Sequence, residues 1–185
     1  MLKRKLVLFI MATALLWNSF VTPVELNAKQ VTIEENAKVT PKTSKVTKKI
    51  LKVPKKQKDF KAWMSYSVFS KSSAQAKLQK KAKTGKYGIR EVTGRKCVAV
   101  GTYYSKKVGD KLDITLKNGK KIKCIVADVK ADKDTNKTNQ VCKHNGSIVE
   151  FVVNTKKMPK SVRHSGSYSS IKSLSGKITK IEKIK

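Results

Sequence analysis

The chain has 185 residues, and its 43 Lys and Arg residues against 12 Asp and Glu give it a formal net charge of +31. That length suffices for one domain with a hydrophobic core and a tail. Nearly all the basic residues are Lys, so the charge predicts anionic surroundings and argues against sequence-specific nucleic-acid recognition, which favours the planar guanidinium of Arg. The sequence has no G-x-S-x-G or H-E-x-x-H motif, which argues against the serine hydrolases and zinc peptidases that carry them.

Residues 1–28 have the three parts of an export signal. Basic residues at 3–5 precede an apolar run at 6–17, and Leu-Asn-Ala at 26–28 offers a cleavage site. We therefore expect a secretory signal peptide that is cleaved near Ala28, with an uncleaved N-terminal anchor as the alternative. Either places the body of the protein outside the cell, secreted or cell-wall associated. Removal of this segment, with three basic residues and one acid, leaves a charge of +29.

Residues 29–58 are predicted to be a basic, disordered spacer. The stretch 38–58 contains nine Lys and two Pro but no aromatic residue. Charge repulsion and a small apolar area argue against a packed core there. We expect the folded domain to occupy residues 59–185.

Aromatic and apolar residues between 60 and 69 begin the predicted domain, because they would be costly to leave in water. Ser72 and Gln75 have the S-x-x-Q spacing of a capping box, which predicts a helix over about 74–82 that ends before Gly85. This helix is the lead-in to a series of strands.

The remaining pattern is typical of short strands. Thr93-Gly94 and Asn118-Gly119 predict turns, the latter because both residues tolerate positive φ. The stretch 176–184 fits a strand, although its isoleucines also have a helical spacing. We expect strands at 89–92, 96–100, 111–116, 122–128, 147–153 and 176–184, which with one helix predicts a small, mainly β barrel.

The three cysteines are an odd number for an exported protein. Cys97 and Cys124 lie in apolar runs, so one disulfide with a leftover thiol and three free thiols both remain open. Without a C-x-x-C pair, Cys142 and its neighbour His144 do not predict a zinc site.

Acidic residues are scarce in the β region. Asp128 ends an apolar strand and Glu150 interrupts another, so each lines a cleft or faces solvent beside a lysine. The stretch 132–136 begins like a calcium loop, but Lys137 and Lys143 stand where that loop needs Gly and Glu. We expect a polar turn there, and neither a metal ion nor a cofactor.

The order of four segments resembles a known family. AVGTYY at 99–104, the hairpin at 118–119, IVAD at 125–128 and SIVEF at 147–151 resemble the three-aspartate (3D) double-psi β-barrel domain. That domain occurs in lytic transglycosylases of the A type and in Gram-positive cell-wall muralytic proteins. The lead-in that begins at residue 60 also resembles that of exported clostridial-type proteins with such a barrel, and the resemblance ends near residue 155.

This resemblance implies a small six-stranded double-psi-type β-barrel that follows a short N-terminal helix. It implies that Asp128 is the catalytic acid/base at the glycosidic oxygen, and Glu150 matches the family's later acid. We expect Lys130 and Tyr103 to contact substrate.

The expected function is binding of peptidoglycan glycan strands by a monomer, with cleavage like that of a lytic transglycosylase. A non-catalytic wall-binding module is one alternative. A basic protein that binds polyanions (teichoic acids, anionic lipid headgroups or nucleic acid, the last without sequence specificity) is another.

Overall fold

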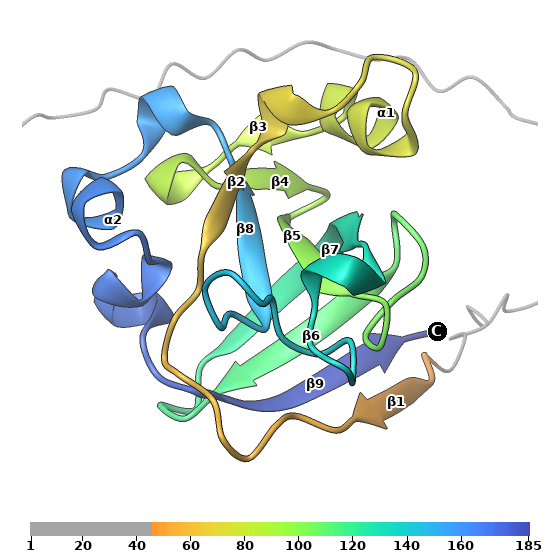
Figure 1. Cartoon of the computed structure of the whole chain (residues 1–185). Helices are drawn as coiled ribbons and strands as arrows, with labels where there is room; N and C mark the ends of the chain where they lie inside the picture. The colour runs from red at the N-terminus through yellow and green to blue at the C-terminus, as the bar shows by residue number, and fades with distance from the viewer. Residues whose placement is uncertain (1–45) are drawn as a thin grey trace, which may run out of the picture. The chain divides into compact units, whose positions relative to one another are not determined.

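The computed structural model describes residues 46–185, which form one sheet of nine strands with two α-helices (Figure 1). The expectation of a mainly β protein is confirmed, with nine strands in place of the six expected. The expected signal peptide and spacer residues 29–45 lie outside the described residues. The strands are β1 (Lys48–Leu51), β2 (Trp63–Ser65), β3 (Lys83–Thr84), β4 (Arg90–Val92), β5 (Arg95–Gly101), β6 (Lys111–Leu116), β7 (Lys121–Lys130), β8 (Val149–Val153) and β9 (Ile178–Ile184); the helices are α1 (Ala74–Lys80) and α2 (Lys160–Ser165).

Strand β5 is the centre of the sheet. It pairs in parallel with β7 on one side, and antiparallel with β4 and then β8 on the other. The path β1-β9-β6-β7-β5-β4-β3 runs through the sheet. Strand β8 branches from β5 and pairs in parallel with β2. Within the described residues this sheet is not closed. Long-range pairing therefore brings residues 95–101, 121–130 and 149–153 side by side.

Part of the expected spacer belongs to the sheet. Strand β1 pairs antiparallel with β9, and the Gln57 side chain both donates to the Ile178 carbonyl and accepts from the Ile178 N–H. Leu51 and Val53 pack against the main core. The boundary expected at Asp59 was therefore too late, because the unpaired backbone groups of β9 provide a partner that composition does not reveal.

Two apolar clusters lie on opposite faces of the central strands. Val98 and Val100 of β5 face the larger core, whereas Cys97 faces a smaller one. Leu78 of α1 and Phe69 cover the smaller core. This packing holds α1, near the top of Figure 1, on the side of the sheet with the smaller core.

Local signals predicted most element boundaries closely. Helix α1 begins at Ala74, as predicted, and ends at Lys80. Its N-cap is Ser73, whose hydroxyl accepts from Ala76 N–H, and not Ser72 of the expected capping box. Thr93 and Gly94 both have positive φ (48° and 73°), as a two-residue hairpin turn requires, whereas in the Asn118-Gly119 turn only Gly119 does. The C-terminal segment is a strand, β9. Within residues 46–185, no helix combines the length and apolarity needed to cross a membrane.

Candidate acid site

Asp128 and Glu150 flank the same residue of the central strand. Ala99 of β5 is in register with Asp128 of β7 on one side and with Glu150 of β8 on the other. Residues in register point to the same face of a sheet. The two carboxylates therefore lie on one face, that of the smaller core, with β5 between them and two strand spacings, about 10 Å, between their backbones.

An irregularity in β7 decides this arrangement. The β5–β7 register shifts between Val98, which pairs with Val126, and Ala99, which pairs with Asp128. Ala127 is the extra residue, as in a β-bulge. If the pairing continued from Val98 without this shift, Ala127 would oppose Ala99, and Asp128 would oppose Val100 and point into the larger core. Strand β7 also continues to Lys130, so Asp128 lies inside the strand and not at its end as expected.

The carboxylate of Glu150 is buried and surrounded by donors. The residue is 5% exposed. Lys130 Nζ lies 2.7 Å from Oε2, and Asn145 Nδ2 donates to Oε1 at 3.0 Å. Burial, together with the charge of Glu150 and a hydrogen bond to it, raises the pKa of the Cys142 thiol. A buried charge needs such partners. Glu150 is paired with a lysine, as one alternative expected, but it is buried and does not face solvent.

Lys130 reaches Glu150 across two small residues of β5. Lys130 is in register with Gly101, and Ala99 lies beside Glu150. A Cβ at Gly101 would stand 2.1 Å from the carbonyl oxygen of Asn139, so the loop after β7 packs directly on that glycine. Lys130, which was expected to contact substrate, is engaged in an ion pair with Glu150.

Asp128 has a different and more open environment. Its Oδ1 accepts a hydrogen bond of 3.1 Å from Nε2 of Gln75, in the first turn of α1. The residue is half-buried. The sequence predicted that Gln75 takes part in a capping box with Ser72. The N-cap is Ser73 instead, so the capping-box position falls on Ala76. The Gln75 amide is therefore free to orient the Asp128 carboxylate.

Tyr103 is 41% exposed just beyond β5 and meets Tyr104 edge to face, with ring centroids 5.1 Å apart. Its ring lines a hollow of about 480 Å³. Val129 of β7 and Asp132 also line this hollow, whereas Asp128 does not. Val129 packs against the larger core, so it points to the opposite face of β7 from Asp128. An exposed aromatic ring beside polar side chains is a surface on which a sugar ring can pack.

The loop that began like a calcium loop is held by other bonds. Asp132 accepts a hydrogen bond of 2.6 Å from the Thr102 hydroxyl, and Asn136 Oδ1 accepts from the N–H groups of Gln140 and Val141. Among residues 46–185, no three His, Cys, Asp or Glu side chains are grouped closely enough to hold a metal ion.

Comparison of the chain with protein-family models, curated proteins and solved structures gave no match. The chemistry of the site therefore rests on its own geometry. One carboxylate, Asp128, is held by a neutral amide and is partly accessible, whereas the other, Glu150, is buried with a cation. Such unequal environments suit two carboxylates for different roles.

The three cysteines are free and buried. Cys124 faces the larger core and Cys97 the smaller one. Although they lie on neighbouring strands, opposite faces keep the two thiols from pairing, so of the alternatives left open by the sequence the structure has three thiols.

Proposed function

We propose that this domain acts outside the cell, binds peptidoglycan glycan strands and cleaves them as a lytic transglycosylase-like enzyme. The observation that carries the proposal is the placement of Asp128 and Glu150 on one face, on either side of Ala99. The export signal and the family resemblance read from the sequence support the same conclusion.

The proposed fold is a double-psi-type barrel built around β5, β7, β8 and β2. Its support is the pair of parallel contacts, β5–β7 and β2–β8, in a sheet that is otherwise antiparallel. Parallel neighbours need long crossover connections, which distinguishes this arrangement from a simple meander of hairpins.

Asp128 is the proposed catalytic acid and base. In its protonated form it donates the proton to the glycosidic oxygen, and the bond from that oxygen to the anomeric carbon breaks. The carboxylate then removes the proton of a hydroxyl of the same sugar, whose oxygen bonds to the anomeric carbon and closes an anhydro ring. The proton returns to Asp128 and no water is consumed.

Glu150 and Tyr103 have supporting roles in this proposal. The ion pair between Lys130 and Glu150 holds β8 in place beside Ala99 and occupies the Glu150 carboxylate. Of the two acids, Asp128 is therefore the accessible one. Tyr103 provides an exposed ring for packing against a sugar beside the hollow near β7.

The test is digestion of purified peptidoglycan with mass analysis of the products. We expect anhydro-muropeptides from the unaltered protein and none from Asp128→Asn. Asp134→Asn is the matched control, because this substitution removes the same charge from an exposed residue in the loop after β7. Binding of intact peptidoglycan without any released product would identify a non-catalytic wall-binding module. Equal turnover by Asp128→Asn would exclude Asp128 as the acid.

A further inference from the structure

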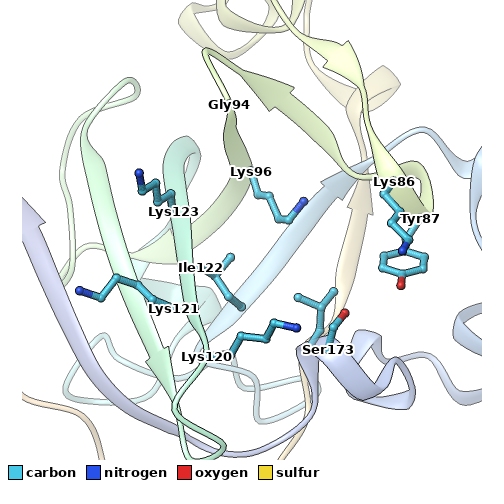
Figure 2. Close-up of a pocket in the computed structure, with 10 residues that line it drawn as sticks. Lys86, Tyr87, Gly94, Lys96, Lys120, Lys121, Ile122, Lys123 and Ser173 are labelled. Carbon is cyan, nitrogen blue, oxygen red and sulfur yellow. The ribbon is translucent and has the colours of Figure 1, made fainter.

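A basic groove lies at the opposite end of β7 from Asp128. It is a hollow of about 470 Å³ between the start of β7, the β4–β5 turn and two 3-10 turns, Lys86–Gly88 and Lys172–Leu174 (Figure 2). Lys121 and Asp128 are seven steps apart along the extended strand, about 23 Å at roughly 3.3 Å per residue. The groove is lined by Lys86, Tyr87, Gly94, Lys96, Lys120, Lys121, Ile122, Lys123, Ser173 and Leu174.

The lysines surround the groove from several elements. Figure 2 shows Lys96 and Lys120 extending toward the space beside Tyr87 and Ser173. Lys121 and Lys123 extend to the other side of β7, so their ammonium groups point away from that space. A neighbouring hollow shares Tyr87, Lys120 and Ser173 with the groove and adds Lys172. The two hollows together form a basic surface that is longer than a binding site for a single small anion.

Most of this charge is not neutralised by the protein. Glu91 pairs with Lys96, and Glu182 lies 3.7 Å from Lys121. Among residues 46–185, Lys86, Lys120, Lys123 and Lys172 have no carboxylate within ion-pair distance. Asp113, which is in register with Lys123, is bound by Arg95. Lys123 points to the other side of β7, so the ammonium groups of Lys86, Lys120 and Lys172 remain here for an external anion.

Tyr87 is held at the groove in a strained conformation. Its φ of 62° is in the left-handed region, which is unfavourable for a residue with a Cβ. The Tyr168 hydroxyl donates to the Tyr87 carbonyl at 2.8 Å, and Gly88 packs where a Cβ would stand 2.8 Å from the Lys157 backbone. These contacts hold the turn in place despite the unfavourable backbone conformation of Tyr87. Strained backbone of this kind is typical of functional positions.

The Tyr87 ring is already covered by a cation on one side. Lys86 Nζ lies 4.9 Å from the ring centroid. Hydrogen bonding by Lys86 and Ser173, with the charges of Lys86 and Lys120, lowers the pKa of the Tyr87 hydroxyl. The phenol therefore serves this groove as a polar group among cations, with one ring face occupied.

The two sides of the groove are tied together. Asn118 Nδ2 donates to the Ser175 carbonyl at 3.0 Å, and Lys117 N–H donates to the Lys177 carbonyl. These bonds join the β6–β7 turn, which carries Lys120, to the segment that carries Ser173. A site that is already arranged loses less free energy on binding.

We propose that this groove binds a linear polymer of polyol phosphodiesters, the chemistry of teichoic acids. Ammonium groups along an open groove complement a series of phosphates on a flexible chain. No Arg lines the groove, and its one aromatic ring is partly covered, so it lacks the guanidinium and stacking surfaces that favour nucleic acid. Its hollow shape suits a chain better than a flat lipid surface. The proposal is independent of catalysis at Asp128.

The test measures binding of the purified protein to purified poly(glycerol phosphate) by calorimetry at two salt concentrations. We expect Lys86→Gln/Lys120→Gln to weaken binding at least tenfold, and to lower the slope of log affinity against log salt by about 1.4 for two phosphates. Lys77→Gln/Lys160→Gln removes the same charge from exposed positions on α1 and α2, and we expect less than a twofold change.

Tyr87→Asn provides a second variant that tolerates the left-handed backbone but removes the ring. We expect it to fold with an unchanged circular dichroism spectrum and to bind the polymer several-fold more weakly. Equal weakening by the two lysine pairs would show that net charge alone binds the polymer and would overturn the proposal. Tighter binding of single-stranded DNA or of phosphatidylglycerol vesicles that needs Lys86 and Lys120 would also overturn it, in favour of that anion.

Discussion

The ammonium group of Lys130 lies 2.7 Å from a carboxylate oxygen of Glu150, across the strand that separates β7 from β8. Both side chains are largely buried, with 18% and 6% of their surfaces exposed. The pair joins β7, which carries the proposed catalytic acid Asp128, to β8, in which every residue is buried. Removing the pair therefore tests how much it contributes to the stability of the acid site.

Lys130→Met keeps the aliphatic chain but removes the cation. It leaves the buried Glu150 carboxylate without a counter-ion, and we expect the free energy of unfolding to fall by about 3 kcal/mol. Chemical denaturation at pH 7 measures this loss. The double variant Lys130→Met/Glu150→Leu removes both charges and is expected to recover most of it. A loss below about 0.5 kcal/mol in the single variant would mean that solvent screens the pair.

Gly101→Ala tests the contact between β5 and the loop after β7. The added Cβ would stand 2.1 Å from the Asn139 carbonyl oxygen, so the loop must move. We expect the free energy of unfolding to fall by about 2–3 kcal/mol. Gly94→Ala is the control, because Gly94 has a φ of +73° and open space around it and is expected to lose only about 1 kcal/mol. Equal losses in a thermal melt would contradict the steric explanation.

The lowered pKa of Asp59 is expected to account for part of the loss of stability of the domain in acid. Partial burial raises its pKa, but hydrogen bonds from Lys61, Ser169 and the Gly176 N–H outweigh burial and hold the pKa below 3.8. The folded state therefore binds fewer protons than the unfolded state as the pH falls toward 3.8. The Asp59 carboxylate therefore stabilises the folded state above pH 3.8, and this stabilisation is lost as the pH falls through the lower pKa that Asp59 has in the folded state.

The variant Asp59→Asn is expected to flatten the decline of stability between about pH 5 and pH 2. It should also lower stability at pH 7, because Lys61 is 2% exposed and loses its carboxylate partner. Urea denaturation across this pH range measures both effects. Asp134→Asn, at an exposed loop position, serves as control. An unchanged pH profile in Asp59→Asn would show that other carboxylates determine the acid limit.

The three thiols are expected to be unreactive in the folded protein. Burial raises the pKa of Cys97 to about 11 and also raises that of Cys124, so little thiolate is present at neutral pH. A colorimetric thiol reagent at pH 8 should find almost no reaction in native buffer and three thiols in denaturant. Only one reactive thiol in denaturant would indicate a disulfide.

Local sequence signals predicted a large part of the secondary structure. The Thr93-Gly94 and Asn118-Gly119 turns, the strand β6 and the helix α1 were predicted because each depends on residues within a few positions. The spacer prediction was wrong for β1, whose stability depends on β9, more than a hundred residues away. Composition describes a segment alone and does not reveal its partner.

The sequence by itself determined that Asp128 and Glu150 are acids in apolar strands. Only the tertiary structure decided that they share a face. The extra residue Ala127 shifts the pairing of β7 against β5 by one position, and side chains alternate faces at every residue. That one-residue shift turns Asp128 away from the larger core and places it, with Glu150, beside Ala99.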